Sequence, residues 1–156
     1  MRAAGTISLR RGVSDSTSLI GFFHSRDSVA VSDSQSAGFP MNFLGAVVEG
    51  PSREGFYFYP ACRLPHSGEA YARHGDAPRI LPDGRPGRWT LDYDPAAVGA
   101  AGRVTLTLDG KPVRLDLLAG QRRDARFDRF GIVTTWIDGN AQRVYFDDLS
   151  YTFRQD

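Results

Sequence analysis

Apolar and polar side chains alternate with a period of two over most of this 156-residue chain. The clearest runs are residues 89–93, 104–108 and 113–117, where Trp, Tyr, Val or Leu occupies every second position. Successive side chains of a strand point to opposite faces, so this alternation is typical of antiparallel strands with one buried face. A helix would need a period near 3.6 residues, which these runs do not have.

Similar runs rich in Val, Ile, Phe and Tyr predict strands over residues 5–10, 18–24, 43–49, 55–63, 127–137 and 143–153. Residues 50–54 and Asp109-Gly110 have the composition of turns. Residues 27–39 and 64–87 are predicted to be long loops, and residues 95–101 a loop or one short turn. With about nine or ten strands and no convincing helix, residues 1–156 are predicted to form one all-β domain, an antiparallel two-sheet β-sandwich.

Charge and cysteine content narrow the possible partners and location. The formal net charge of +1 argues against nucleic acid and membrane as partners, because both attract a concentrated basic surface. Cys62 is the only cysteine, so no internal disulfide is possible. No apolar run is long enough to span a membrane or resembles a signal peptide.

Since the sequence starts in a strand-like run, we expect the chain to be a module of a larger multidomain secreted protein. Its expected location is extracellular or periplasmic.

Several segments carry a family resemblance. Residues 88–110, RWTLDYDPAAVGAAGRVTLTLDG, resemble a common piece of the concanavalin A-like (laminin G-like) β-sandwiches: a Trp-initiated strand, a short irregular link and a strand ending in Asp-Gly. The ending RVYFDDLSYTF resembles the closing strand of these folds and of carbohydrate-binding jelly rolls. Residues 20–25 and 49–60 are similar to uncharacterised modules of large secreted bacterial proteins. The resemblance implies a jelly-roll fold, which hosts lectins, glycan hydrolases, lyases and interaction modules.

The aromatic strand at residues 56–59 suggests a ligand-binding face. Its alternation places two Phe rings on one face and Tyr57 and Tyr59 on the other, with Arg63 sharing the Tyr face and Glu49 at the facing end of the hairpin. Exposed aromatic rings can stack on sugars while their hydroxyls hydrogen-bond. We therefore predict glycan binding by these four residues. The alternative is that the Tyr face packs on the second sheet.

Two further residues are candidates for the same role. Trp136 precedes the turn at residues 137–140 and is predicted to be a sugar platform, although it also continues a core-facing stripe that begins at Phe130. His24 ends a buried strand and is expected to reach the ligand face near Arg26.

Asp147 and Asp148 stand in an otherwise aromatic and β-branched strand, where acidic residues are depleted. Only one of them can face inward unless a bulge re-aims the chain. The resemblance suggests Asp147 as a ligand of a structural Ca²⁺, an ion that takes oxygen ligands. The alternative is a carboxylate that is satisfied by backbone N–H groups and pins a loop.

Catalytic groups are sparse. The Glu-x-Asp-x-x-Glu strand of the retaining glucanases of this fold is absent. The loop over residues 64–87 holds candidates for a metal site or for acid–base chemistry of the lyase type, namely His66, Glu69, Tyr71, Arg73, His74, Asp76 and Asp83. We predict a non-catalytic carbohydrate-binding module whose partner is a polysaccharide. The alternatives are a small glycan-acting hydrolase or lyase and a protein-interaction or spacer module.

Overall fold

The computed structural model describes residues 1–14, 16–27, 39–51, 55–133 and 142–153. Ten strands occur in this part of the chain: β1 (Arg2–Arg11), β2 (Thr17–Phe23), β3 (Phe43–Glu49), β4 (Tyr57–Leu64), β5 (Gly68–Tyr71), β6 (Gly87–Asp94), β7 (Arg103–Leu108), β8 (Lys111–Asp116), β9 (Arg129–Val133) and β10 (Arg143–Thr152). A 3-10 turn (His74–Asp76) and a four-residue helical turn, α1 (Ala97–Ala100), complete the elements. Neither helical turn of the described chain could cross a membrane.

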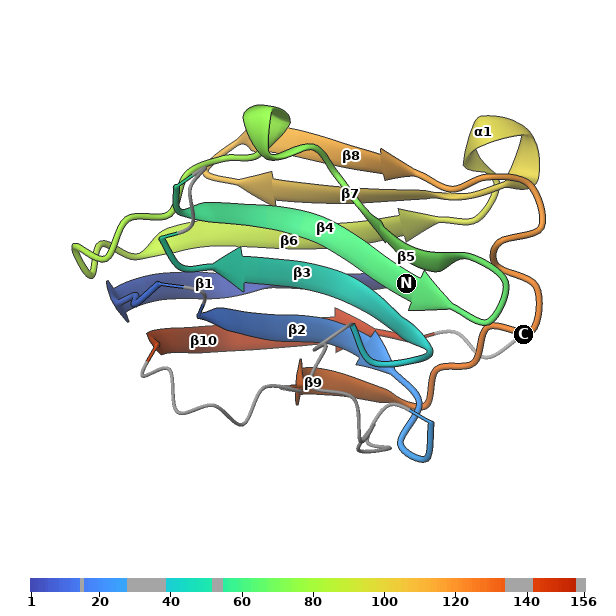
Figure 1. Ribbon diagram of the computed structural model, residues 1–156, viewed down its shortest axis with the longest axis horizontal. Coiled ribbons are helices and arrows are strands. Elements are labelled where there is room, and N and C mark those ends of the chain that lie inside the picture. Colours follow the sequence, from blue (N-terminus) through green and yellow to red (C-terminus); the bar gives the residue numbers. More distant parts are fainter. Residues whose placement is uncertain (15, 28–38, 52–54, 134–141, 154–156) are drawn as a thin grey trace.

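The strands form two antiparallel five-stranded sheets (Figure 1). The first sheet has the order β10-β1-β6-β7-β8, and the second has the order β5-β4-β3-β2-β9. The sheets lie one over the other, with the edge strands β9 and β10 on the same side. The predicted antiparallel two-sheet β-sandwich is therefore confirmed.

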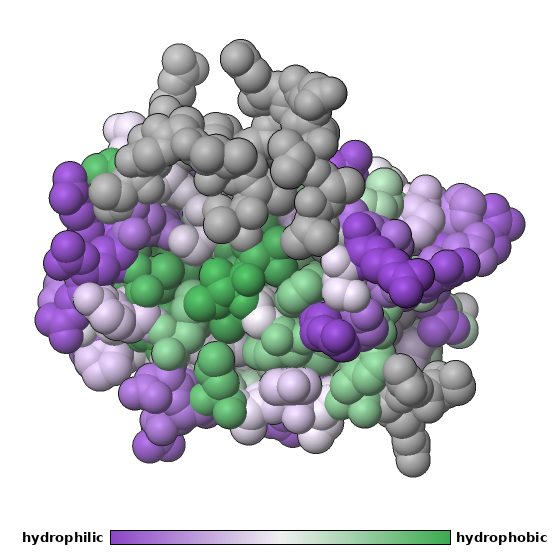
Figure 2. All heavy atoms as spheres, turned by 90° about the horizontal axis from the view of Figure 1, so that it is seen from below, coloured by the Kyte–Doolittle hydropathy of each residue, from purple (hydrophilic) through white to green (hydrophobic). Residues whose placement is uncertain are grey.

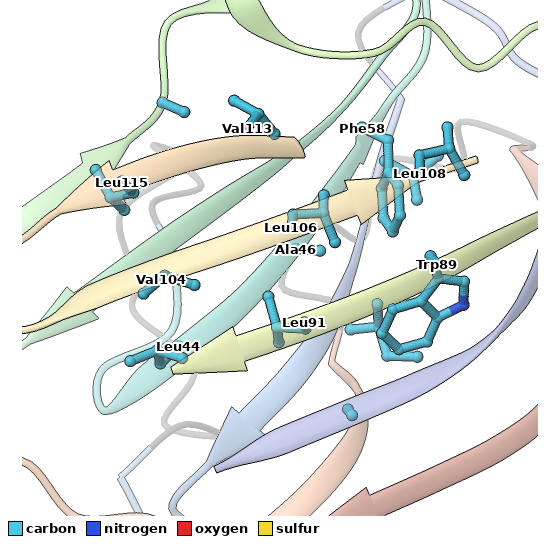
Figure 3. Packing of buried hydrophobic residues seen from close by; sticks show 14 of the residues in the cluster. Leu44, Ala46, Phe58, Trp89, Leu91, Val104, Leu106, Leu108, Val113 and Leu115 are labelled. Atoms are coloured by element: carbon cyan, nitrogen blue, oxygen red, sulfur yellow. The ribbon is translucent and has the colours of Figure 1, made fainter. Parts of the chain in front are cut away.

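The core lies between the sheets and follows the sequence alternation. The first sheet contributes Trp89, Leu91, Val104, Leu106 and Val113, and the second contributes Ile20, Phe22, Leu44, Val48 and Phe58. Trp89 of β6 and Phe58 of β4 meet edge to face with ring centroids 6.2 Å apart (Figure 3). Cys62 is buried in the same core, and burial raises the pKa of its thiol to about 12.

The connection predicted as a loop over residues 64–87 contains a strand. Gly68–Tyr71 forms β5 and pairs antiparallel with the end of β4, from Ala61↔Tyr71 to Leu64↔Gly68. The prediction missed this strand because its four residues, Gly-Glu-Ala-Tyr, are mostly exposed and show no apolar alternation. Backbone pairing to β4, rather than side-chain burial, defines it.

Strand β10 contains a β-bulge at the Asp pair. Its pairing to β1 shifts between Thr6↔Asp147 and Ala4↔Ser150, so that Asp148 and Leu149 stand opposite the single residue Gly5. Asp148 has a φ of 51°, in the left-handed region. A Cβ at Gly5 would lie 2.7 Å from the carbonyl oxygen of Asp147, which explains the glycine at this close approach.

The bulge changes which residues of β10 lie on the inner face of the first sheet. Phe146, before it, lies edge-on to Trp89 at 6.3 Å. Tyr151, after it, stacks on Phe130 at 4.9 Å, and Phe153 lies 6.3 Å from Phe22. A regular strand could not direct both Phe146 and Tyr151 to one face, because the side chains of a strand alternate.

We expect Asp148→Val to lower the free energy of unfolding by about 1–2 kcal/mol, because a β-branched residue is strained at positive φ. Asp148→Gly should cause no such loss, since glycine adopts this conformation freely. Ser150→Val on the same strand is the control. Urea unfolding measures all three variants, and equal stability of Asp148→Val and Ser150→Val would contradict the bulge.

Candidate functional site

Four of the predicted ligand-binding residues lie on the outer face of the second sheet, the face turned away from the first sheet. Tyr57, Tyr59 and Arg63 alternate along β4 with the core residues Phe58 and Cys62. Glu49 of β3 pairs with Tyr57. The structure thus brings these four residues to one face, while their role in binding stays a prediction.

The two tyrosines are buried on that face. Tyr57 is 8% and Tyr59 6% exposed. They belong to a second apolar cluster, whose other members are Leu19, Phe43, Val47, Ala61 and Ala77, with Phe23 and Phe39 packed against it. The rings are therefore neither exposed nor packed between the sheets, and both sequence interpretations of them are wrong. Among the described residues, Ala77 and Phe39 come from the connections around the sheet and add apolar surface to this face.

Arg63 and Glu69 hold the backbone of Phe39. These two side chains come from residues paired across β4 and β5. Nη1 of Arg63 donates to the carbonyl oxygen of Phe39 at 2.8 Å, and the N–H of Phe39 donates to Oε1 of Glu69 at 2.7 Å. This arrangement, the Phe39 clamp, fixes the chain at the end of the outer face. Charge-assisted hydrogen bonds of this kind are among the stronger ones in proteins.

Tyr71 is an exposed aromatic residue on the outer face. It ends β5, and its side chain is 53% exposed. Its ring lies 6.2 Å from Tyr59 and edge-on to Phe39 at 6.3 Å. An aromatic ring that is positioned by its neighbours and about half exposed suits stacking on a sugar. Sequence reasoning placed Tyr71 only in a loop with possible lyase chemistry, because β5 was not predicted.

His24 lies in a polar network just after β2. Its Nδ1 is 3.1 Å from Oδ2 of Asp27, which also accepts a hydrogen bond from Nδ2 of Asn42 at 2.7 Å. Oδ1 of Asn42 accepts the N–H of Arg126 at 3.1 Å, and Asn42 itself is buried. The network ties the turn after β2 to the start of β3 and to the segment before β9. His24 thus has a structural contact, and its predicted ligand contact stays a prediction.

Asp128 makes a similar connection. Its two carboxylate oxygens accept the N–H and the hydroxyl of Ser25 at 2.7 and 2.6 Å. The side-chain and backbone hydrogen bonds from Ser25 lower the pKa of the Asp128 carboxyl below its ordinary value of 3.8. The ionised form of Asp128 therefore stabilises the fold.

The remaining predicted residues have varied positions. Glu49 is half-buried and lies between Thr17 and Tyr57 in the sheet. Trp136 lies outside the described residues. Asp147 is exposed, and its Oδ1 accepts the N–H of Asp148 at 2.8 Å. In the described ranges no group of three or more His, Cys, Asp or Glu residues could hold a metal ion. Calcium at Asp147 stays a prediction.

A histidine–carboxylate pair lies near the turn between β4 and β5. Nε2 of His66 is 2.8 Å from Oδ2 of Asp124. This hydrogen bond, first among several causes, lowers the pKa of the Asp124 carboxyl. Such a pair can orient an imidazole for proton transfer.

The edge of the sandwich between β9 and β10 exposes apolar surface. Figure 2 shows hydrophobic side chains gathered in the middle of the side seen from below, with hydrophilic ones around them. Ile132 of β9 and Leu149 and Tyr151 of β10 are 58%, 46% and 57% exposed. These three side chains therefore present apolar surface to the solvent at this edge.

The protein is therefore an antiparallel β-sandwich that carries aromatic side chains on the outer face of its second sheet. Among solved structures, the chain is similar to the crystal structure of alginate lyase PA1167 from Pseudomonas aeruginosa, with a TM-score of 0.54 and 13% sequence identity. The match covers 98% of this chain and 64% of that chain, so this chain spans about 64% of its length. No protein-family model and no curated protein matches the chain. The likeness shows the sandwich fold.

We expect Asp128→Asn to lower the free energy of unfolding at neutral pH. We also expect the free energy of unfolding of this variant to fall less between neutral and acidic pH than that of the unaltered chain. The Asp128 contribution is present above its unfolded-state pKa near 3.8 and is lost as the pH falls through its lower folded-state pKa. Urea unfolding between pH 7 and 3 measures the effect, with Asp76→Asn, the loss of an exposed carboxylate elsewhere in the chain, as control. An unchanged pH dependence in Asp128→Asn would contradict the assignment.

Proposed function

We propose that this chain is a non-catalytic carbohydrate-binding module of the concanavalin A-like type, which binds a polysaccharide on the outer face of the second sheet. The observation that carries the proposal is Tyr71, an exposed ring at the edge of that face, in contact with Tyr59 and Phe39. The likeness to an alginate lyase, a glycan-acting enzyme by its name, supports a glycan as ligand.

The other predicted residues take supporting roles in this proposal. Tyr57 and Tyr59 underlie the face, and the Phe39 clamp of Arg63 and Glu69 keeps Tyr71 and its neighbours in place. A sugar ring stacked on Tyr71 would lie beside Arg63 and Glu69, which are paired across β4 and β5. Their further N–H donors and carboxylate oxygens suit hydroxyl groups or an acidic substituent.

A glycan lyase or hydrolase is the second candidate. The His66–Asp124 pair and the likeness to a lyase favour it. Catalysis needs an acid, a base and a neutralising group converging on one sugar. Incubation with alginate and other polysaccharides tests it: unsaturated products with ultraviolet absorbance would indicate a lyase, and new reducing ends alone a hydrolase.

An interaction module is the third candidate, favoured by the exposed apolar side chains at the β9–β10 edge. A broad glycan screen separates it from the first. Binding of one polysaccharide class supports the carbohydrate module, and loss of binding under a chelator supports a calcium ion held by Asp147. A folded chain that binds no glycan favours the interaction module.

In either role, as a carbohydrate-binding or an interaction module, we propose an extracellular or periplasmic location within a larger bacterial protein.

We expect Tyr71→Ala to weaken glycan binding about tenfold, equivalent to about 1.4 kcal/mol, because the sugar loses its stacking surface. Tyr145→Ala is the matched control, since Tyr145 lies on β10 and is exposed to a similar extent, 54%. Calorimetric titration with the best polysaccharide of the screen measures both variants. Equal affinities in Tyr71→Ala and the unaltered chain would contradict the assigned face.

A further inference from the structure

A separate pocket of about 340 Å³ lies at the end of the sandwich where β6 and β8 begin, the left end in Figure 1. It is lined by β1, by the segment over residues 79–87 and by the turn between β7 and β8. Its size is at the lower end of the range for small-molecule sites, roughly 300–1,000 Å³. It is distinct from the outer face around Tyr71.

The lining of the pocket includes five apolar residues, namely Ile7, Ile80, Leu81, Pro86 and Leu108. Ile7, Ile80 and Leu108 are 1%, 6% and 6% exposed. Gly87 keeps room between them, because a Cβ there would lie 2.9 Å from Cδ1 of Leu108 and 3.0 Å from Oδ2 of Asp109. An apolar wall of this kind suits the C–H face of a sugar ring.

The backbone around the pocket is tied down on both sides. Arg79 forms a β-bridge with Tyr57 of the second sheet. Gly84, with a φ of 75°, donates its N–H to the carbonyl oxygen of Leu9 in the first sheet at 2.9 Å. The segment therefore spans the two sheets, and a ligand would meet an ordered backbone, which lowers the entropic cost of binding.

The polar lining carries more unpaired positive than negative charge. The cations are Arg79, Arg85 and Lys111, and the carboxylates are Asp83 and Asp109. None of these cations forms a salt bridge with a carboxylate of the described chain.

Each carboxylate, in contrast, already has a donor. Oδ1 of Asp83 accepts the N–H of Arg85, and Oδ1 of Asp109 accepts the N–H of Arg88, both at 2.8 Å. The second oxygen of each carboxylate is left to accept a ligand hydroxyl. The lining holds three cations against two carboxylates, a formal excess of one positive charge, so the pocket favours an anion.

We propose that this pocket binds a small acidic sugar, a uronate, through its carboxylate. Arg79, Arg85 and Lys111 meet the carboxylate, the sugar ring lies on the apolar wall, and the second oxygens of Asp83 and Asp109 accept hydroxyl groups. The sugar identity rests on the proposed function, whereas the preference for an anion rests on the charges of the pocket alone.

Nuclear magnetic resonance titration of the full chain with galacturonate tests the proposal, with galactose as the neutral partner of the same ring and sulfate as a plain anion. We expect saturable shifts of the Gly87 and Leu108 amides with galacturonate, weaker ones with sulfate and none with galactose. Arg85→Gln and Lys111→Gln should each weaken binding about threefold to tenfold. Arg114→Gln, an equal change of charge on the exposed face of β8, should leave binding within about twofold.

Three outcomes would overturn the proposal: galacturonate shifts that lie away from Gly87 and Leu108, equal affinity for galacturonate and galactose, or affinity unchanged in Lys111→Gln and Arg85→Gln. Equal affinity for sulfate and galacturonate would reduce the site to a plain anion site and overturn the sugar assignment. Tyr71→Ala separates the two sites. If it binds galacturonate normally while no polysaccharide binds the outer face, the pocket stands and the proposed function of the outer face fails.

Discussion

The edge-to-face contact between Phe58 and Trp89 fixes the direction of every side chain on β4. Burial of Phe58 between the sheets forces its neighbours Tyr57 and Tyr59 to the opposite face, because a strand alternates strictly. A one-residue slip would place two phenol hydroxyls in the core and expose Phe58, at the cost of several buried contacts. The position of Arg63 beside Phe39, and thus the whole outer face, depends on this register.

The outer face is built as a second, smaller core with a polar border. Leu19, Phe43 and Val47 would be exposed on a bare sheet, but here they are buried with the two tyrosines. The Phe39 clamp and the His24–Asp27–Asn42 network hold the chain at the border of this cluster. What this leaves open is the β5 edge, where Tyr71 stands exposed. We propose that the Tyr71 ring, fixed at the edge of the sheet, binds the carbohydrate, and that a wide groove is not required.

The alternation of residues 89–93, 104–108 and 113–117 predicted three strands of the first sheet, and burial of their apolar positions confirms the prediction. Alternation also grouped Tyr57, Tyr59 and Arg63 on one face. The alternation could not predict the burial of the two tyrosines. Ala77 and Phe39, which pack with them, belong to connections whose apolar residues show no periodic spacing. Strand β5 was missed for a related reason, since backbone pairing alone defines it. The charged pocket was missed as well, because its lining converges from three separate segments.

The role of Tyr71 at the edge of the outer face can be seen in a crystal structure of the chain with an oligosaccharide of the polysaccharide class that it binds. We expect a sugar ring stacked on Tyr71, with its polar groups toward Arg63 and Glu69. A complex in which the oligosaccharide lies elsewhere, with the Tyr71 ring in contact only with protein or solvent, would contradict it.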